Sequence, residues 1–184
     1  MKSVFALYVA IWQLSLIECS FDAAVPVGNT DVIIHAVYPC DGVDPSTYSE
    51  IELKDDGNEK WVEFMIQMDQ AIDDTFTANM VVDQWKNGAW EENIYNTDGT
   101  LCDMKEQFAR KCWYKLAEAS EPKADPTNCY VAPGTYIGKK YQAAGDDLDI
   151  PSMLFGTFRV RFDVFNEEND LFFCTMIELE ASPK

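Results

Sequence analysis

The stretch that decides the fold is residues 76–90, FTANMVVDQWKNGAW, which combines a strand pattern with a turn. In its first half, every second residue is apolar: Phe76, Ala78, Met80 and Val82. This period of two is typical of a strand that is buried on one face. The pair Asn87-Gly88 then favours the positive φ angles of a type I′ turn. Since a tryptophan lies on each side of that turn, the stretch predicts a β-hairpin with tryptophans on both arms.

Similar strand patterns occur on both sides of this hairpin. Residues 31–38 are rich in β-branched residues, and residues 61–68 alternate with an apolar face at the even positions. Residues 158–164 alternate in the same way, and a polar turn at 166–170 leads into another strand at 171–180. Most of the chain is therefore predicted to form antiparallel strands.

One helix interrupts the strands. Apolar residues and the stem of one lysine recur at helical spacing: Leu101, Lys105, Phe108, Cys112 and Leu116. Residues 98–100 supply a start signal, and Pro122 prevents continuation. The predicted fold class is all-β: a single-domain β-cup or sandwich of about seven or eight antiparallel strands with one inserted helix.

The N-terminus has the pattern of a secretory signal. Lys2 precedes an apolar run over residues 4–17, and Ser20 follows a plausible cleavage site after Cys19. A membrane anchor, the alternative, needs roughly 20 apolar residues. We therefore expect a signal peptide at 1–19 and one secreted domain at 20–184 that is not embedded in a membrane.

Charge and cysteine content narrow the class of partner. The formal net charge is −18, so the surface repels nucleic acid and anionic lipid headgroups. Six widely spaced cysteines with a single histidine and no Cys-x-x-Cys pair favour structural disulfides over a zinc site. A cut after Cys19 leaves an odd number of cysteines, which suggests a free thiol or an intermolecular bond. We expect no metal and no cofactor.

No catalytic motif stands out. The single imidazole, His35, lies in a predicted strand, and nucleophile-elbow, P-loop and His-Glu-x-x-His patterns are missing from the sequence. The acidic run at 146–149 lacks the alternating ligands and closing glutamate of a calcium loop. We expect a protein that is not an enzyme.

Several short motifs follow one another from the hairpin onward: Leu101-Cys102-Asp103, Trp113-Tyr114-Lys115, the segment 129–136 (CYVAPGTY), Asp149-Ile150-Pro151, Phe158-Arg159-Val160, Asn169-Asp170-Leu171, and Cys174 with Ile177-Glu178. In this order they resemble the ganglioside activator family and the insect CheB-type chemosensory family, over roughly residues 85–183. One departure is Tyr130, which follows Cys129 where relatives usually have proline.

The resemblance implies a secreted β-cup that holds a lipid-like molecule between its sheets. It also implies two disulfides, Cys40–Cys174 and Cys102–Cys129. Cys112 is then left without a partner, unless cleavage spares Cys19 and a Cys19–Cys112 bridge forms.

Aromatic and methionine side chains are more numerous than a thin sandwich needs, and flexible or flat side chains suit a lipid cavity. Ordinary core packing is the alternative for each of them. The candidates for the cavity wall are Phe64, Met68, Phe76, Met80, Trp85, Trp90, Phe108, Trp113, Phe155, Phe158 and Phe162. We expect the helix and the tryptophan hairpin to form the rim.

The functional hypothesis is a secreted, non-catalytic binding protein for lipids or hydrophobic semiochemicals such as pheromones, in insect chemosensation. Its expected partners are a long-chain hydrophobic ligand and a membrane chemoreceptor. Two alternatives remain: an extracellular protein–protein interaction module with a filled sandwich core, and a lipocalin-type carrier. A Gly-x-Trp motif, typical of lipocalins, is missing near the mature N-terminus.

Overall fold

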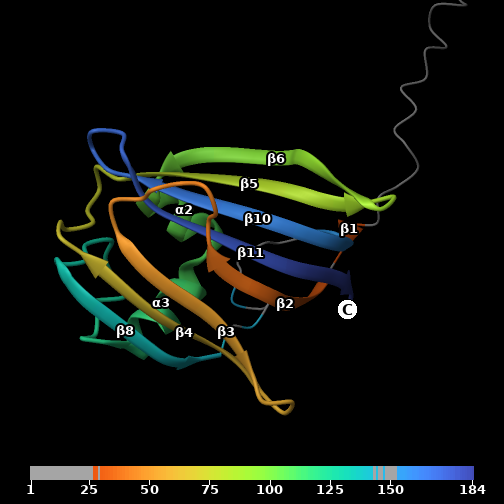
Figure 1. Cartoon of the computed structure of the whole chain (residues 1–184), viewed down its shortest axis with the longest axis horizontal. Coiled ribbons are helices and arrows are strands. Elements are labelled where there is room, and N and C mark those ends of the chain that lie inside the picture. Colours follow the sequence, from red (N-terminus) through yellow and green to blue (C-terminus); the bar gives the residue numbers. More distant parts are fainter. Residues whose placement is uncertain (1–26, 29, 143, 145–146, 148–152) are drawn as a thin grey trace, which may run out of the picture.

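The computed structural model describes residues 27–28, 30–142, 144, 147 and 153–184 (Figure 1). The predicted signal peptide with Cys19 and the Asp149-Ile150-Pro151 motif lie outside the described residues. Of the acidic run 146–149, only Asp147 is described.

The larger sheet has five antiparallel strands in the order β2-β11-β10-β5-β6 (Figure 1). Their bounds are β2 Thr30–Pro39, β5 Thr77–Lys86, β6 Ala89–Thr100, β10 Gly156–Phe165 and β11 Leu171–Pro183. The strand predictions at 31–38, 76–82, 158–164 and 171–180 are confirmed by this sheet.

The smaller sheet has four antiparallel strands in the order β3-β4-β8-β7, and two short strands pair separately. The smaller sheet consists of β3 Tyr48–Asp55, β4 Lys60–Met68, β7 Ser120–Glu121 and β8 Gly134–Tyr141, and the separate pair is β1 Val27–Gly28 with β9 Met153–Leu154. The predicted all-β class is confirmed.

The hairpin predicted at residues 84–90 joins β5 to β6. Asn87 and Gly88 have φ angles of 53° and 84°, as a type I′ turn requires. Trp85 pairs with Trp90 across the two strands, and their rings meet edge to face with centroids 5.3 Å apart.

The helical segment is correctly placed, but it is two helices, α2 (Leu101–Phe108) and α3 (Arg110–Ala119). The Thr100 hydroxyl caps α2 by accepting a hydrogen bond from the Asp103 N–H. Ala109 interrupts the helix with φ −144° and ψ 23°. Because α2 contacts β5 and β6 while α3 contacts β8, the break lets each helix follow a different sheet. Packing here overrides the helix propensity of alanine.

The two sheets contact each other directly where β2 passes β3. On the other side, α2 and α3 bridge the larger sheet to the smaller one (Figure 1). Buried residues form two clusters. One is built around α2 and the β10–β11 turn, with Leu101, Met104 and Phe172, and the other lies around Phe158 and Leu179.

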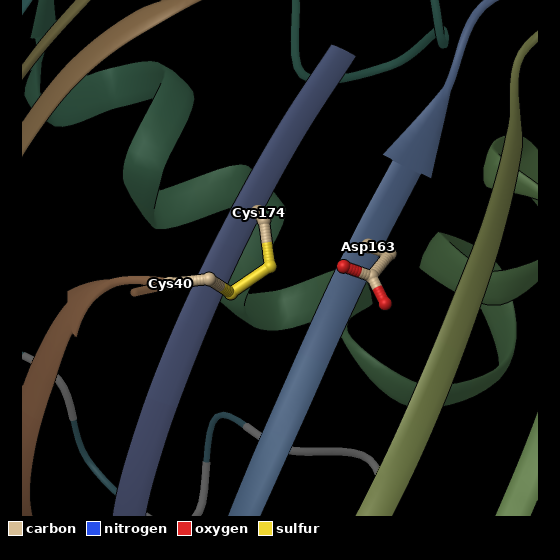
Figure 2. A group of neighbouring side chains, drawn as sticks. All are labelled: Cys40, Asp163 and Cys174. Carbon is tan, nitrogen blue, oxygen red and sulfur yellow. A yellow bond between two sulfur atoms is a disulfide. The ribbon is translucent and has the colours of Figure 1, made fainter. Parts of the chain in front are cut away.

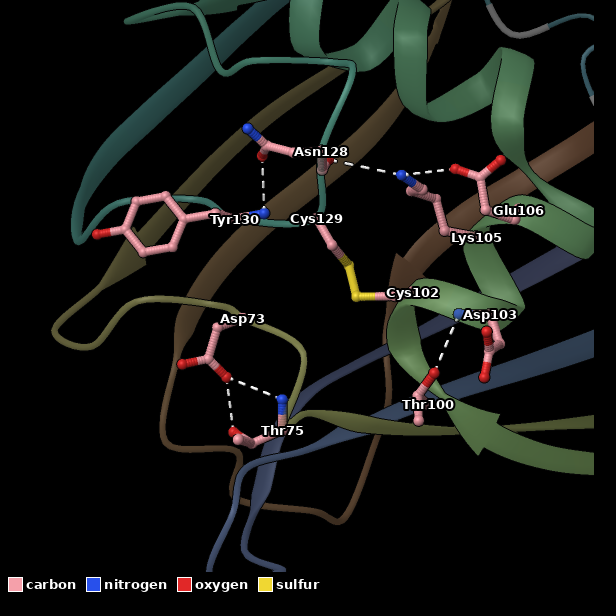
Figure 3. The surroundings of a disulfide bond; sticks show 10 residues. All are labelled: Asp73, Thr75, Thr100, Cys102, Asp103, Lys105, Glu106, Asn128, Cys129 and Tyr130. Atoms are coloured by element: carbon pink, nitrogen blue, oxygen red, sulfur yellow. Dashed lines mark hydrogen bonds and ion pairs between the residues drawn. A yellow bond between two sulfur atoms is a disulfide. The ribbon is translucent and has the colours of Figure 1, made fainter.

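Both predicted disulfides are present. Cys40 bonds to Cys174 across 134 residues and attaches the end of β2 to the first part of β11. Cys102 bonds to Cys129 across 27 residues and attaches the first turn of α2 to the loop before β8 (Figure 3). Cys112 is free in the part of the chain that the structure describes.

Candidate ligand-binding cavity

A cavity of about 740 Å³ lies between the two sheets, and both sheets and both helices contribute to its wall. Strand periodicity determines which side chains face it, since alternate residues of a strand point to one side. In β4 the even-numbered residues from Val62 to Met68 line the cavity. In β10 the even-numbered residues from Phe158 to Val164 do the same. The wall includes members of both buried clusters, so the cavity runs from one cluster to the other.

Most of the aromatic and methionine candidates lie in this wall. Those that line the cavity are Phe64, Met68, Met80, Phe108, Trp113, Phe158 and Phe162. They come from β4, β5, β10, α2 and α3, so the fold brings together residues that are almost 100 positions apart in the sequence (64 to 162).

Four candidates are not among the residues that line this cavity. Phe76 is only 3% exposed, and its ring meets Phe172 edge to face at 5.0 Å, so it belongs to packed core. Phe155 lies between β9 and β10 and is not among the residues that line the cavity. Its main-chain carbonyl accepts a hydrogen bond from the Gln84 side chain.

The other two are the hairpin tryptophans. Trp85 is an odd-numbered residue of β5, whereas the cavity-lining residues Met80 and Val82 are even-numbered, and its side chain is 45% exposed. The Trp90 ring lies 4.7 Å from the Arg159 guanidinium, a cation–π contact on the outer side of the larger sheet. The hairpin therefore does not form a rim of the cavity, whereas both helices border it.

Sequence reasoning missed a large part of the wall, most of it aliphatic. Residues that line the cavity and were not selected include Ile34, Val37, Ile51, Val82, Ile94, Met104, Tyr136, Tyr141, Val160 and Leu179. The alternation along their strands is the signal that could have found most of them. The aliphatic residues were left out because candidates were chosen by side-chain type and not by their position along the strand.

Two charged side chains in the wall are buried, Lys105 and Asp147. Lys105 is 6% exposed, and its ammonium pairs with the exposed Glu106 carboxylate at 2.8 Å (Figure 3). The same ammonium donates to the Asn128 carbonyl at 3.5 Å, beside the Cys102–Cys129 bridge (Figure 3). It also lies 5.9 Å from the centroid of the Trp113 ring. The ammonium therefore lies between α2, the loop before β8 and the Trp113 ring of α3.

Two polar atoms in the wall have no hydrogen-bond partner among the described residues: the Thr47 hydroxyl and the Trp113 indole nitrogen. Thr47 is 1% exposed, and its main-chain N–H donates to the Phe172 carbonyl. Leaving a buried donor unsatisfied costs about 1–3 kcal/mol, so each of these atoms marks a position where a ligand could supply a partner.

The free thiol of Cys112 also borders the cavity. The Tyr141 hydroxyl donates to its sulfur at 3.2 Å, and burial raises the pKa of the Cys112 thiol above its usual range. Nearby, the buried Asp147 carboxylate pairs with the Lys115 ammonium at 2.5 Å. The protonated thiol is a poor nucleophile at neutral pH.

The described residues contain one close group of potential metal ligands: Cys40, Asp163 and Cys174 (Figure 2). The two sulfurs are bonded to each other and so are not thiolates. The Asp163 carboxylate accepts hydrogen bonds from the Arg161 guanidinium at 2.9 and 3.0 Å. The group is therefore explained by a disulfide and an ion pair on neighbouring strands. His35 lies in β2, partly exposed, 3.3 Å from the Glu180 carboxylate.

In the described part of the chain, no helix is long and apolar enough to cross a membrane. No family model matches the sequence, and no curated protein does. Among solved structures, the chain is similar to chicken MD-1 complexed with lipid IVa, at 14% identity and a TM-score of 0.34. The match covers 86% of this chain and 99% of that one. Similarity at this level carries no argument about function.

Proposed function

We propose that this protein is a secreted, non-catalytic binding protein that holds a lipid or another long-chain hydrophobic molecule between its two sheets. The observation that carries the proposal is the cavity of about 740 Å³ with its largely apolar wall. Its volume falls within the range of about 300–1,000 Å³ that is usual for small-molecule sites.

Binding would come from removal of hydrocarbon from water, worth about 25 cal/mol for each Å² of apolar surface before ordering costs. Met68, Met80 and Met104 supply flexible side chains that adapt to chains of different shape. The protonated Cys112 thiol fits a site that holds a ligand without reacting with it.

Secretion is supported by the two disulfides, since such bonds persist in oxidising compartments. The finer proposal is a role in insect chemosensation, with a hydrophobic semiochemical as ligand and a membrane chemoreceptor as partner. It rests on the resemblance to the ganglioside activator and CheB-type families.

The cavity favours a carrier over an interaction module, because a module with a filled sandwich needs no connected space of this size. The sheet order favours a two-sheet cup over a lipocalin, because lipocalins close eight strands into one barrel.

The first experiment is native mass spectrometry of the protein secreted from insect cells, followed by organic extraction and identification of any retained lipid. A fluorescent fatty acid then measures affinity for the wild type and two variants. Val82→Trp places a bulky ring in the cavity, whereas Val81→Trp, the matched control, changes the neighbouring residue on the opposite face of β5.

We expect Val82→Trp to weaken binding at least about tenfold, equivalent to about 1.4 kcal/mol. Val81→Trp should bind as the wild type does. If the secreted protein retains no lipid and the probe does not bind, or if the two variants bind equally well, the carrier function is wrong.

A further inference from the structure

The cavity is chemically asymmetric. Around Phe158 and Leu179, the side chains that pack together are hydrocarbon: Val32, Val82, Ile94, Leu154, Val160 and Ile177. At the end formed by the two helices, the wall contains the Lys105 ammonium and the Trp113 indole nitrogen. A ligand that spans the cavity therefore meets hydrocarbon at one end and nitrogen donors at the other.

Lys105 and Trp113 form what we call the donor corner. Both groups can donate hydrogen bonds, and neither can accept one. The Lys105 ammonium has three protons, of which two are directed to the Glu106 carboxylate and the Asn128 carbonyl (Figure 3). The Trp113 indole N–H has no acceptor among the described residues and is shielded from solvent.

Other buried polar groups of the wall do not create the same demand. The Asp147 carboxylate pairs with the Lys115 ammonium and accepts a hydrogen bond from the Ala144 N–H. The hydroxyls of Ser120, Tyr136 and Thr175 each donate to a main-chain carbonyl. The Thr47 hydroxyl has no partner in the described chain, but a hydroxyl both donates and accepts, so it does not select between ligand classes. The donor corner is selective because it supplies donors only.

We infer, on the premise that the proposed carrier function holds, that the ligand is an oxygen-bearing long-chain molecule whose terminal carbonyl or carboxylate oxygen accepts hydrogen bonds from Trp113 Nε1 and Lys105 Nζ. Its hydrocarbon tail extends toward Phe158 and Leu179. A plain hydrocarbon leaves the indole N–H unsatisfied, and a cationic amine places a positive charge beside the Lys105 ammonium.

The test compares four ligands with the same chain: palmitate, methyl palmitate, hexadecane and hexadecylamine. Each displaces a fluorescent probe from the wild type and from the Trp113→Phe, Lys105→Met and Trp90→Phe variants. Trp113→Phe keeps an aromatic ring and removes the N–H, and Lys105→Met keeps an apolar stem and removes the charge. Trp90→Phe is the matched control, since Trp90 lies outside the cavity wall.

In the wild type, we expect palmitate or its ester to bind at least about tenfold more tightly than hexadecane, with the amine weakest. Trp113→Phe should weaken the oxygen-bearing ligands about three- to tenfold and leave hexadecane unchanged. Trp90→Phe should change neither. Lys105→Met should weaken palmitate more than methyl palmitate, because only palmitate has a negative charge that pairs with the ammonium. A wild-type preference for palmitate over its ester points to a free acid as the ligand, and the reverse preference points to an ester or aldehyde.

Equal affinities for palmitate, its ester and hexadecane would overturn this inference and leave the carrier function intact. The same follows if both donor-corner variants still prefer the oxygen-bearing ligands to hexadecane as strongly as the wild type does. If none of the four ligands displaces the probe, or the probe itself does not bind, the proposed function fails first. Cooperative thermal unfolding of each variant establishes that it is folded. If one of the two donor-corner variants does not fold, the other still tests the inference.

Discussion

Replacing Gly138 with alanine tests the wall of the cavity most directly. Gly138 in β8 lies opposite Phe64 in β4, and the Phe64 ring lies across the glycine. A Cβ atom on residue 138 would lie 2.0, 2.3 and 2.6 Å from three ring carbons of Phe64. Carbon atoms that are not bonded normally approach to about 3.5–4.0 Å, so the ring has to move by more than 1 Å. Because Phe64 lines the cavity, we expect the ring to turn into that space.

The cost follows from this overlap. Overpacking a core costs about 1–3 kcal/mol, and about 2 kcal/mol lowers the melting temperature of a domain of this size by roughly 4–8 °C. A ring that turns into the cavity also reduces the volume left for a ligand. We therefore expect Gly138→Ala to lower both the melting temperature and the affinity for a fluorescent fatty acid.

The matched control is Gly99→Ala in β6. There the added Cβ would meet the Met104 side chain at 3.8 Å, an ordinary contact, so we expect no loss and a gain of up to about 1 kcal/mol from reduced backbone entropy. Combining Gly138→Ala with Phe64→Leu should recover part of the lost stability, because the smaller side chain removes the overlap. A Gly138→Ala protein that melts and binds as the wild type does would refute the placement of the ring.

The remaining predictions concern the long disulfide and one tyrosine. Cys174→Ser removes the disulfide to Cys40, which closes a loop of 134 residues. We expect it to lower the unfolding free energy by about 5 kcal/mol and to reduce secretion. The control, Cys112→Ser, removes a free thiol and should cost far less. Burial and a hydrogen bond to Glu178 raise the pKa of Tyr38 from 10.0 to about 12. The protonated tyrosine therefore stabilises the fold below pH 10, and this contribution is lost as the pH rises to about 12. The denaturant concentration at the unfolding midpoint should fall less steeply over this pH range in Tyr38→Phe than in the wild type.

Local patterns predicted much of the fold because they depend on neighbouring residues. The apolar residues at every second position from Val62 to Met68 and from Phe158 to Val164 indicate which face of each strand is buried. The pair Asn87-Gly88 favours the type I′ turn that the hairpin has. Strand β3 was missed, although Ile51 and Leu53 alternate with Glu50, Glu52 and Lys54, which is the pattern of a strand with one exposed face. The disulfide pairings came from family resemblance, because cysteine spacing alone leaves several pairings open.

The cavity residues were harder to predict for a different reason. Phe76 and Phe158 look alike in the sequence, since each is an aromatic residue on the apolar face of a strand. In the structure, Phe76 packs against Phe172, whereas Phe158 borders the cavity. The difference depends on what lies across from each ring, and that is decided by segments far away in the chain.

The sequence by itself determined most of the strands with their buried sides, the hairpin turn and the helical segment. These depend on backbone preferences and on the period of two, which act over a few residues. Only the tertiary structure decided that the buried faces enclose a cavity, that the helix breaks at Ala109, and that Lys105 meets Trp113. A packed core and a cavity wall place the same apolar residues on the same faces, so the distance between the two sheets distinguishes them.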